Sequence, residues 1–530
     1  MAFVLAYDIG TTGVKTCVFS ITDKIELIAD ANAGYGLYIG DNGEAEQEPD
    51  EWWEAMASTT RKALTRAGLP PESIEGVSFC SQMQGLVLTD EKGNALRRAF
   101  SYMDQRSRAE LKKGMGGGIQ IAGGNIFKVL RSLLINHATS TSVKDPVWKY
   151  KWVEAHEPEI FAKTRYWLDV KDYLVARCTG EIKMTEDSAF GTLISDTRPG
   201  KEGWSKPLCK MYGVNMEHLA PIIKCTDQAG SLTEKAAAEL GLCPGTPVFG
   251  GGGDASLIGV GAGAVKLGET HVYCGTSGWV ITVVDRQKVD VNAMIASTVG
   301  AVSGKFNYFA EMETAGKCLE WVKDHLALDE INVYCEKQDI VGRSQEKVYT
   351  SLYDYLTDTI RTVEPGCGGL IFTPWLHGNR CPFEDPNAAG MFFNLKLETG
   401  KAKMIRAVIE GVCFHLRWML ECQSQKVQTS PRLRFVGGGA LSDVTCQILA
   451  DVTGRTVETV DSPQNVGSVG AAAVIGVGLG LIDSMERVGD FIGVSAVYEP
   501  NPDNKAVYDR NYQVFRRLYQ SNKKNFELLN

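Results

Sequence analysis

A β-hairpin pattern occurs twice in this sequence, and the recurrence constrains the fold more than any other feature does. Residues 2–20 contain two apolar runs joined by Gly-Thr-Thr-Gly, and residues 269–284 repeat the arrangement around Gly-Thr-Ser-Gly. Each segment predicts two antiparallel strands connected by a tight turn without bulky side chains. An ordinary β-turn would explain either hairpin alone, but two of them in one chain favour a duplicated fold.

The two turns also predict a site for phosphate groups. Backbone N–H groups and hydroxyls that no large side chain covers can cradle phosphate oxygens. The candidates are Gly10, Thr11, Thr12 and Lys15 in the first hairpin, and Gly275 and Thr276 in the second. Asp8, at the end of the first strand, is placed to hold a Mg²⁺ ion through water. We therefore expect a nucleotide between two similar halves.

Length and composition exclude several classes of protein. A chain of 530 residues is too long for a single core, so two large domains, or three, are expected. The net charge of −9, without a basic tract to offset it, argues against a nucleic-acid partner. The 14 cysteines include no C-x-x-C pair, which favours reduced thiols over disulfides or a zinc site.

The apolar segments favour a cytoplasmic protein with no membrane partner. The first apolar run leads directly into Asp8 and has no basic region before it, unlike a signal peptide. The longest apolar segment, residues 469–482, is too short to cross a bilayer and predicts a buried helix.

Strand-like and helical stretches alternate along the chain, which is typical of an α/β protein. The apolar spacing predicts helices at 49–68, 150–157, 170–178, 314–326, 400–425 and 444–454, and a closing surface helix in the last forty residues. A glycine-rich run, 245–269, separates the two halves and suits hinge bending. Residues 114–147 predict an irregular surface excursion over a cleft, and residues 327–348 a polar insertion.

Asp254 is the candidate catalytic base. It follows four glycines at the end of an apolar strand, so its carboxylate can face a cleft without obstruction. Phosphoryl transfer to an alcohol needs such a group to accept the hydroxyl proton. Asp254 would alternatively cap the helix that begins after it, and both roles are compatible.

A second glycine-rich turn, Gly437-Gly438-Gly439-Ala440, joins a strand-like run to a helical one. Such a turn lets a nucleotide approach the backbone closely, although a plain strand–helix connector fits nearly as well.

Four residues of the first half form the candidate substrate pocket. They are Met83, Gln84, Asp104 and Arg106. A surface ion pair is the alternative for Arg106. Asp172 is a further candidate for a sugar hydroxyl, with a helix N-cap as its alternative.

In their order and spacing, the motifs resemble the FGGY family of carbohydrate kinases over nearly the whole chain. They are DIGTTGVK (8–15), SQMQG (81–85), MDQRS (103–107), KDYLVARCTGE (171–181), GGGDAS (251–256), YCGTSG (273–278), ETAGKCLEW (313–321), GGLIFTPWLHGNRCPFEDP (368–386), FVGGGALSD (435–443) and GSVGAAA (467–473). The resemblance implies α/β architecture with duplicated actin-like ATPase (ribonuclease H-like) domains, and ATP and Mg²⁺ in the interdomain cleft. It implies an N-terminal domain at 1–258 that binds sugar and carries the base, and a C-terminal domain at 259–530 that binds ATP and ends in a closing helix.

The resemblance also implies roles for individual residues. Asp254 matches the general base, Ala255 joins it in the sugar site, and Asp8 matches the carboxylate near Mg²⁺. The positions that face the phosphates are Thr11, Thr12 and Thr276, and those near the nucleotide are Gly316, Glu320, Gly439, Ala440 and Asp443. Asp443 stands where relatives commonly have asparagine.

Within the family the sequence is most similar to xylulose kinases, through SQMQG and TEDSAFGTLISDT (185–197). Gln84 stands where those enzymes have a histidine that touches the sugar, and an amide that both donates and accepts hydrogen bonds still suits a polyol. The resemblance thus implies ATP-dependent phosphorylation of a ketopentose such as D-xylulose, with L-xylulose, ribulose or erythritol as alternatives. It also implies a homodimer.

Two other classes of protein share parts of this pattern. An actin-like ATPase that acts as a chaperone or filament would keep the phosphate hairpins, but it has no use for the acceptor motifs SQMQG and GGGDAS. A degenerate kinase that senses sugar is the other alternative, and the intact Asp8, Asp254 and Thr276 argue against it.

Overall fold

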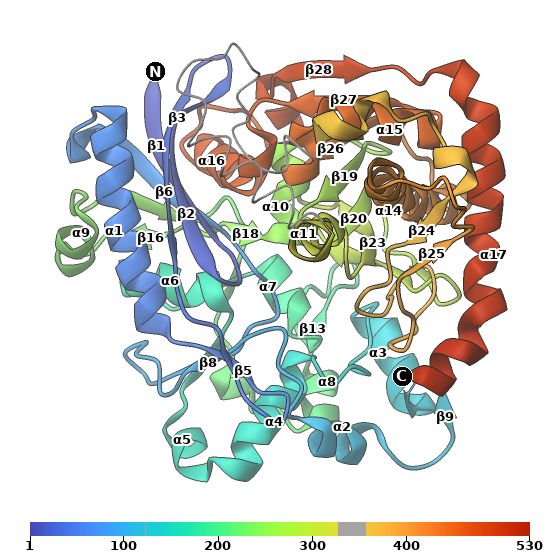
Figure 1. The fold of residues 1–530 in the computed structure, drawn as a ribbon. Coiled ribbons are helices and arrows are strands. Elements are labelled where there is room, and N and C mark those ends of the chain that lie inside the picture. Colours follow the sequence, from blue (N-terminus) through green and yellow to red (C-terminus); the bar gives the residue numbers. More distant parts are fainter. Residues whose placement is uncertain (122, 327–356) are drawn as a thin grey trace.

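The computed structural model describes residues 1–121, 123–326 and 357–530, and each half of the molecule is built on one large β-sheet (Figure 1). The polar insertion expected at 327–348 lies outside the described residues.

The first sheet has the strand order β16-β17-β6-β1-β2-β3, with β18 also paired to β6. Its strands are β1 (Ala2–Ile9), β2 (Gly13–Ile21), β3 (Ile25–Gly34), β6 (Ile74–Ser81), β16 (Gln228–Ser231), β17 (Pro247–Phe249) and β18 (Gly252–Gly253). β1 and β2 are antiparallel and join through the Gly-Thr-Thr-Gly turn, which confirms the first predicted hairpin. β6 runs parallel to β1 on its other side.

The second sheet has the order β21-β22-β23-β20-β19-β26-β27-β28. Its strands are β19 (Thr270–Cys274), β20 (Gly278–Val284), β21 (Val289–Asp290), β22 (Ile295–Val299), β23 (Phe306–Met312), β26 (Arg432–Val436), β27 (Thr456–Val460) and β28 (Val494–Tyr498). β19 and β20 form the second predicted hairpin, and β26 runs parallel to β19.

The central strands of the two sheets follow one plan. In the first, β3, β2 and β1 are antiparallel neighbours and β6 continues in parallel; in the second, β23, β20 and β19 are antiparallel and β26 continues in parallel. The predicted duplicated α/β fold is therefore confirmed.

Helices cover the outer faces of both sheets (Figure 1). In the first half α1 (Pro49–Ala67) and α6 (Val170–Thr179) contact the sheet, and α9 (Glu234–Leu240) packs against both helices. In the second half α14 (Lys401–Ser424) and α15 (Asp443–Thr453) contact the sheet, and α11 (Gly316–His325) and α17 (Lys505–Leu529) pack against α14. The periodic segments at 49–68, 170–178, 314–326, 400–425 and 444–454 thus form the predicted helices, and the last forty residues contain the closing helix α17.

Two helices, α10 (Asp254–Gly261) and α16 (Val466–Gly478), pack against each other between the sheets (Figure 1). They belong to a buried apolar cluster that takes residues from both sheets, such as Phe19 and Ile281. The buried helix predicted at 469–482 corresponds to α16. Among the described residues, no helix has the length and apolar character needed to cross a bilayer.

The excursion at 114–147 is more ordered than its glycines indicated. It contains the end of α2 (Arg108–Met115), the short strands β9 (Gln120–Ile121) and β10 (Gly124–Asn125), α3 (Ile126–Ile135) and the start of α4 (Pro146–His156), the helix expected at 150–157. The other helices of the first half are α5 (Pro158–Lys163), α7 (Glu186–Gly191) and α8 (Lys206–Tyr212).

Short strands complete the fold. They are β4 (Tyr38–Ile39), β5 (Ala45–Gln47), β7 (Val87–Thr89), β8 (Ala99–Phe100), β11 (Tyr166–Leu168), β12 (Met184–Thr185), β13 (Ser195–Asp196), β14 (Gly203–Trp204), β15 (Ile222–Ile223), β24 (Ile371–Thr373) and β25 (Met391–Phe393).

Candidate active site

The strand register brings Asp8 and Asp254 to one edge of the first sheet. Asp8 on β1 lies opposite Cys80 on β6, and Cys80 lies opposite Gly252 on β18. Because neighbouring strands lie about 4.8 Å apart, the Cα atoms of Asp8 and Gly252 are about 10 Å apart. Asp254 begins α10 only two residues after Gly252. The sequence therefore predicted correctly that both carboxylates follow strands, and the fold brings those strands together.

The environment of Asp254 suits proton transfer at neutral pH. Burial raises the pKa of this carboxyl to about 7; the negative charges of Asp8 and Glu311 raise it as well, and the N–H of Ala255, which donates to Oδ1 at 2.7 Å, opposes them. The side chain is only partly buried, so the carboxylate keeps access to a ligand. A carboxyl group with a pKa near the working pH is suited to act as a general base.

Asp8 lies on the inner face of the first sheet, next to the start of α16. Burial raises the pKa of Asp8 above its usual range, and the positive charge of Lys15 opposes the shift. A Cβ at Gly467 would stand 2.9 Å from Oδ2 of Asp8, so only glycine lets α16 approach this carboxylate so closely. Lys15 donates from Nζ to the carbonyl oxygen of Gln464 at 2.8 Å, which ties the first hairpin to the second half.

Hydrogen bonds hold the turn of the first hairpin firmly in place. The N–H of Gly10 donates to the carbonyl oxygen of Gly13 at 2.9 Å, and the hydroxyl of Tyr35 donates to the carbonyl oxygens of both glycines. Thr12 is exposed at the tip, and Thr11 is half-buried. The turn therefore presents its threonines on a rigid backbone.

The second turn has a helix docked on it. Gly275 and Thr276 accept backbone hydrogen bonds at 2.7 Å from Gly316 and 3.3 Å from Lys317. A Cβ at Gly316 would stand 2.5 Å from the carbonyl oxygen of Gly275, so this close approach requires glycine. Thr276 is exposed beside the N-terminus of α11, where the positive end of the helix dipole favours an anion. Glu320, one turn further along α11, is exposed.

The turn after β26 packs against the second hairpin. Gly437 has a φ of 90° and leads into the 3₁₀ turn Gly438–Leu441. A Cβ at Gly439 would stand 2.9 Å from the side chain of Cys274, which places this turn beside β19. Ala440 is buried, whereas Asp443 is exposed and forms a bidentate ion pair with Arg361 at 2.8 and 2.9 Å. Any ligand of Asp443 must therefore share its carboxylate with Arg361.

Met83 and Gln84 lie next to the start of α10. A Cβ at Gly253 would stand 2.1 Å from Cγ of Met83, so this side chain packs directly over the residue that precedes Asp254. Gln84 has a φ of 62°, and the carboxylate of Asp169 fixes this strained residue by accepting its N–H at 3.0 Å. Both side chains are partly exposed, as is Ala255, and Met83 and Ala255 adjoin Asp254.

The environment of Asp104 does not match the expectation that this residue contacts a substrate. Its side chain is fully buried, and its two oxygens accept hydrogen bonds from the N–H of Ala45 at 2.8 Å and from the Arg106 guanidinium at 2.7–3.2 Å. No oxygen of Asp104 is left for a ligand. Arg106, which also pairs with Glu46 at 2.9 Å, belongs to the same buried network rather than to the surface.

Asp187 is a site residue that sequence analysis missed. It accepts the N–H of Gly253 at 2.7 Å and so fixes the backbone immediately before Asp254. Burial opposes its ionisation, but Lys171, Thr185 and the N–H of Gly253 together lower the pKa of Asp187. Lys171 in turn pairs at 2.8 Å with Asp172, which lies inside α6 and is not its N-cap; the cap is Asp169. The segment 185–188 (TEDS) has no local pattern that would predict this contact between Asp187 and Gly253.

Among the described residues, no group of three or more His, Cys, Asp or Glu side chains is gathered as a metal cage. A Mg²⁺ ion needs no such cage, because it usually keeps several waters and takes one or two carboxylates plus phosphate oxygens. The half-buried carboxylate of Asp8 is a single oxygen ligand of this kind and fits that requirement.

Known proteins resemble this chain both in sequence and in fold. A family model described as the N-terminal domain of the FGGY family of carbohydrate kinases matches residues 3–261, and the corresponding C-terminal model matches residues 271–479. The chain is 26% identical to a xylulose kinase of Bacillus subtilis (99% of this chain, 98% of that one) and 28% identical to a gluconokinase of Bacillus licheniformis (98% and 95%). Its fold matches that of a ligand-bound xylulose kinase from Lactobacillus acidophilus with a TM-score of 0.84 over 100% of both chains, at 22% identity.

Proposed function

The chain belongs to the FGGY family of carbohydrate kinases and is a sugar kinase, and we propose that its acceptor is a ketopentose, with D-xylulose as the leading candidate. The observation that carries the proposal is the position of Asp254, a carboxyl group with a pKa of about 7 beside Met83 and Gln84 at the edge that Asp8 shares. L-Xylulose, ribulose and erythritol are the related alternatives.

In the proposed reaction Asp254 accepts the proton of the acceptor hydroxyl. The hydroxyl oxygen forms a bond to the γ-phosphorus of ATP as the bond from that phosphorus to the β-phosphate oxygen breaks, and ADP leaves. Most of the catalysis in such a transfer comes from positioning and from stabilising charge on the phosphates. Asp187 supports this step by holding Gly253, and therefore Asp254, in place.

We assign the phosphoryl donor, ATP, to the two turns. Gly10, Thr11, Thr12 and Lys15 face its phosphates from one half, and Gly275 and Thr276 from the other. Gly316, Glu320, Gly439, Ala440 and Asp443 lie toward the nucleoside. Asp8 would hold Mg²⁺ through water, and the bound ion would neutralise charge on the phosphate oxygens.

The acceptor is assigned to Met83, Gln84, Asp254 and Ala255. The amide of Gln84 can donate to one hydroxyl and accept from another, which suits a neutral polyol. Asp104 supports this region through Arg106 and does not touch the sugar.

Gluconate is the second candidate acceptor. The gluconokinase of Bacillus licheniformis is as similar to this chain as the xylulose kinases are. Gluconate differs from a ketopentose in its carboxylate, so the two candidates make different demands on the charge of the pocket.

The test is an ADP-release assay with ATP–Mg²⁺ and a panel of ketopentoses, pentitols, glycerol, erythritol and gluconate. We expect turnover on a ketopentose, and a loss of at least about 10² in kcat for Asp254→Asn, since general base catalysis contributes roughly that much. Asp503→Asn, which changes an exposed carboxylate in the same way, is the control. Turnover close to wild type in Asp254→Asn would refute the base assignment, and turnover on gluconate alone would refute the ketopentose.

Further proposals concern the cellular location, the domain boundary and the oligomeric state of the enzyme. The cysteines of the described residues are free thiols and mostly buried, which supports a reducing, cytoplasmic location. We also retain the division into 1–258 and 259–530, whose boundary falls inside α10, and a homodimer, which light scattering in solution would test.

A further inference from the structure

A row of side chains crosses the second sheet near the candidate active site. The register places Tyr273 on β19 opposite Trp279 on β20, and Trp279 opposite Glu311 on β23. Residues paired in this way project from the same face of a sheet. The rings of Tyr273 and Trp279 stack with centroids 4.0 Å apart. Glu311 therefore shares their face and lies at the end of the row.

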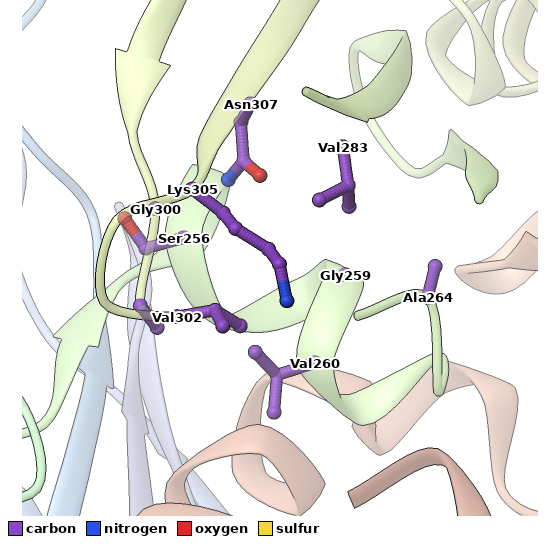
Figure 2. A pocket seen from close by; sticks show the side chains of 10 residues that line it. Ser256, Gly259, Val260, Ala264, Val283, Gly300, Val302, Lys305 and Asn307 are labelled. Carbon is purple, nitrogen blue, oxygen red and sulfur yellow. The ribbon is translucent and has the colours of Figure 1, made fainter. Parts of the chain in front are cut away.

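This face of the second sheet looks toward α10. Asn307, four residues before Glu311 and on the same face of β23, donates from Nδ2 to the carbonyl oxygen of Ala255 at 2.8 Å. Figure 2 shows Asn307 on its strand beside α10, close to Ser256. Since Ala255 directly follows Asp254, Glu311 lies on the wall that the second half presents to the catalytic carboxylate. The charge of Glu311 accordingly contributes to the raised pKa of Asp254.

Arg380 completes this wall. It belongs to the loop after β24, and its Nη1 donates to Oε2 of Glu311 at 2.7 Å. The Arg380 side chain is 55% exposed and that of Glu311 21%, so the pair is open to a ligand. On the first half, Asp145 lies close enough for Arg380 to lower its pKa, against the larger effect of burial. Members of the pair therefore lie near both Asp254 and Asp145 of the first half.

We propose that Glu311 and Arg380 form the second half's wall of the acceptor site, where they hydrogen-bond hydroxyls of a neutral polyol and disfavour an acceptor that carries a carboxylate. A carboxylate accepts from sugar hydroxyls and a guanidinium donates to them. The proposal rests on the sugar kinase function proposed above and refines the class of acceptor.

The exclusion of anions follows from the charges around the pair. Glu311 already neutralises Arg380, so the guanidinium is not free to bind an incoming carboxylate. Asp254 lies near both Asp8 and Glu311, and Glu313 lies near Glu311 and Arg380. Lys144 also lies near Glu311, but the negative charges outnumber it. An anionic acceptor would meet this negative charge, whereas a neutral ketose would not.

The experiment compares Glu311→Gln and Arg380→Met with wild type. KM values are measured for D-xylulose and for ATP, together with KM or the inhibition constant for gluconate. We expect both variants to raise the KM for D-xylulose about fivefold to tenfold, as for one lost hydrogen bond, and to leave the KM for ATP within about twofold. For gluconate the variants should diverge: Glu311→Gln strengthens its binding by freeing Arg380, and Arg380→Met does not.

Two controls separate this effect from general damage. Asp490→Asn removes a carboxylate from another arginine pair, the exposed Arg487–Asp490 pair at 2.6 Å, and should leave all three constants unchanged. Calorimetric titration of each folded variant with D-xylulose in the absence of ATP measures acceptor binding without turnover. The same fivefold to tenfold weakening is expected there.

The outcomes distinguish this proposal from the proposed function. Wild-type turnover on a ketopentose with unchanged sugar affinity in both variants would overturn the Glu311–Arg380 wall and leave the ketopentose kinase intact. If gluconate alone is phosphorylated, the ketopentose assignment and the exclusion of anions both fall. If Glu311→Gln weakens the binding of D-xylulose without strengthening that of gluconate, the contact with the sugar is supported and the exclusion of anions is refuted.

Discussion

At the scale of the residue, the environment of Asp254 favours proton transfer but lowers the stability of the fold. Burial, with Asp8 and Glu311 nearby, raises the pKa of this carboxyl to about 7. That value keeps a large fraction of the group both ionised and basic near neutral pH. The same environment disfavours the charged form that the reaction needs, so the ionised side chain costs the fold free energy.

The free-energy cost of the ionised Asp254 side chain predicts that Asp254→Asn stabilises the protein at pH 8. The pKa of Asp254 is higher in the folded chain than its ordinary value of 3.8. The native state therefore binds more protons than the unfolded state between about pH 4 and 7, and stability is lost as the pH rises through that window. An amide does not ionise, so the variant should melt about 2 °C or more above wild type at pH 8.

Thermal melts followed by circular dichroism at pH 5 and pH 8 check this expectation. The difference should shrink at pH 5, where wild-type Asp254 is protonated, and Asp503→Asn should show no comparable change. A lower melting temperature for Asp254→Asn at pH 8 would contradict the assignment of a buried, costly charge.

Residues could be predicted from sequence where a local pattern carries the information. Asp8, Asp254 and the two threonine turns follow strand-like runs, and the strands put them where such runs end. Asp187 and Glu311 act through partners far along the chain, Gly253 and Arg380, so no local motif marked them. Asp104 was misplaced because a short polar motif does not reveal that Arg106 and Ala45 fill its hydrogen-bonding capacity.

At the scale of the element, the crossing of α10 and α16 sets the position of the proposed base, Asp254. A Cβ at Gly470 would stand 2.3 Å from the carbonyl oxygen of Leu257, and one at Gly261 would stand 1.9 Å from that of Val466. The two helices therefore touch through backbone. Because Asp254 begins α10, any separation of the helices moves the carboxylate that we propose as the base.

Gly470→Ala should accordingly destabilise the protein and lower its activity. Backbone atoms cannot rotate away as a side chain can, so the helices must shift, and overpacking of this kind costs about 1–3 kcal/mol. We expect a lower midpoint in urea and a reduced kcat, with a smaller effect on the KM for ATP. Gly400→Ala, where a Cβ meets no atom within 4 Å, is the control. Equal stability of Gly470→Ala and wild type would show that the contact is looser than described.

Long elements were predictable and short ones were not. The helices α1 and α14 carry several turns of apolar periodicity, so their existence and extent are visible in the sequence. β18 has only two residues, both glycine, and offers no periodic signal, although it places Asp254. The excursion at 114–147 was expected to be irregular because its glycines masked the short helix α3.

At the scale of the whole molecule, the halves share one of their cores. The apolar cluster around α10 and α16 includes Val4 and Phe19 from the first sheet and Trp279 and Ile281 from the second. Neither half can unfold without exposing part of the core of the other.

The shared core predicts one cooperative unfolding transition. Differential scanning calorimetry under reducing conditions should give a single peak with equal calorimetric and van't Hoff enthalpies. ATP–Mg²⁺ should move the whole peak upward, because a ligand that binds only the native state stabilises it by mass action. Two peaks, of which only one responds to ATP–Mg²⁺, would mean that the halves unfold independently.

The position of α16 in the chain also has a consequence for biosynthesis. This helix covers the inner face of the first sheet, yet residues 466–478 are translated long after the strands of that sheet. At about 5–20 residues per second, the finished strands of the first sheet wait roughly 10–40 s for that cover. During this interval the nascent chain carries an open apolar surface, so the first sheet is covered only after α16 has been translated.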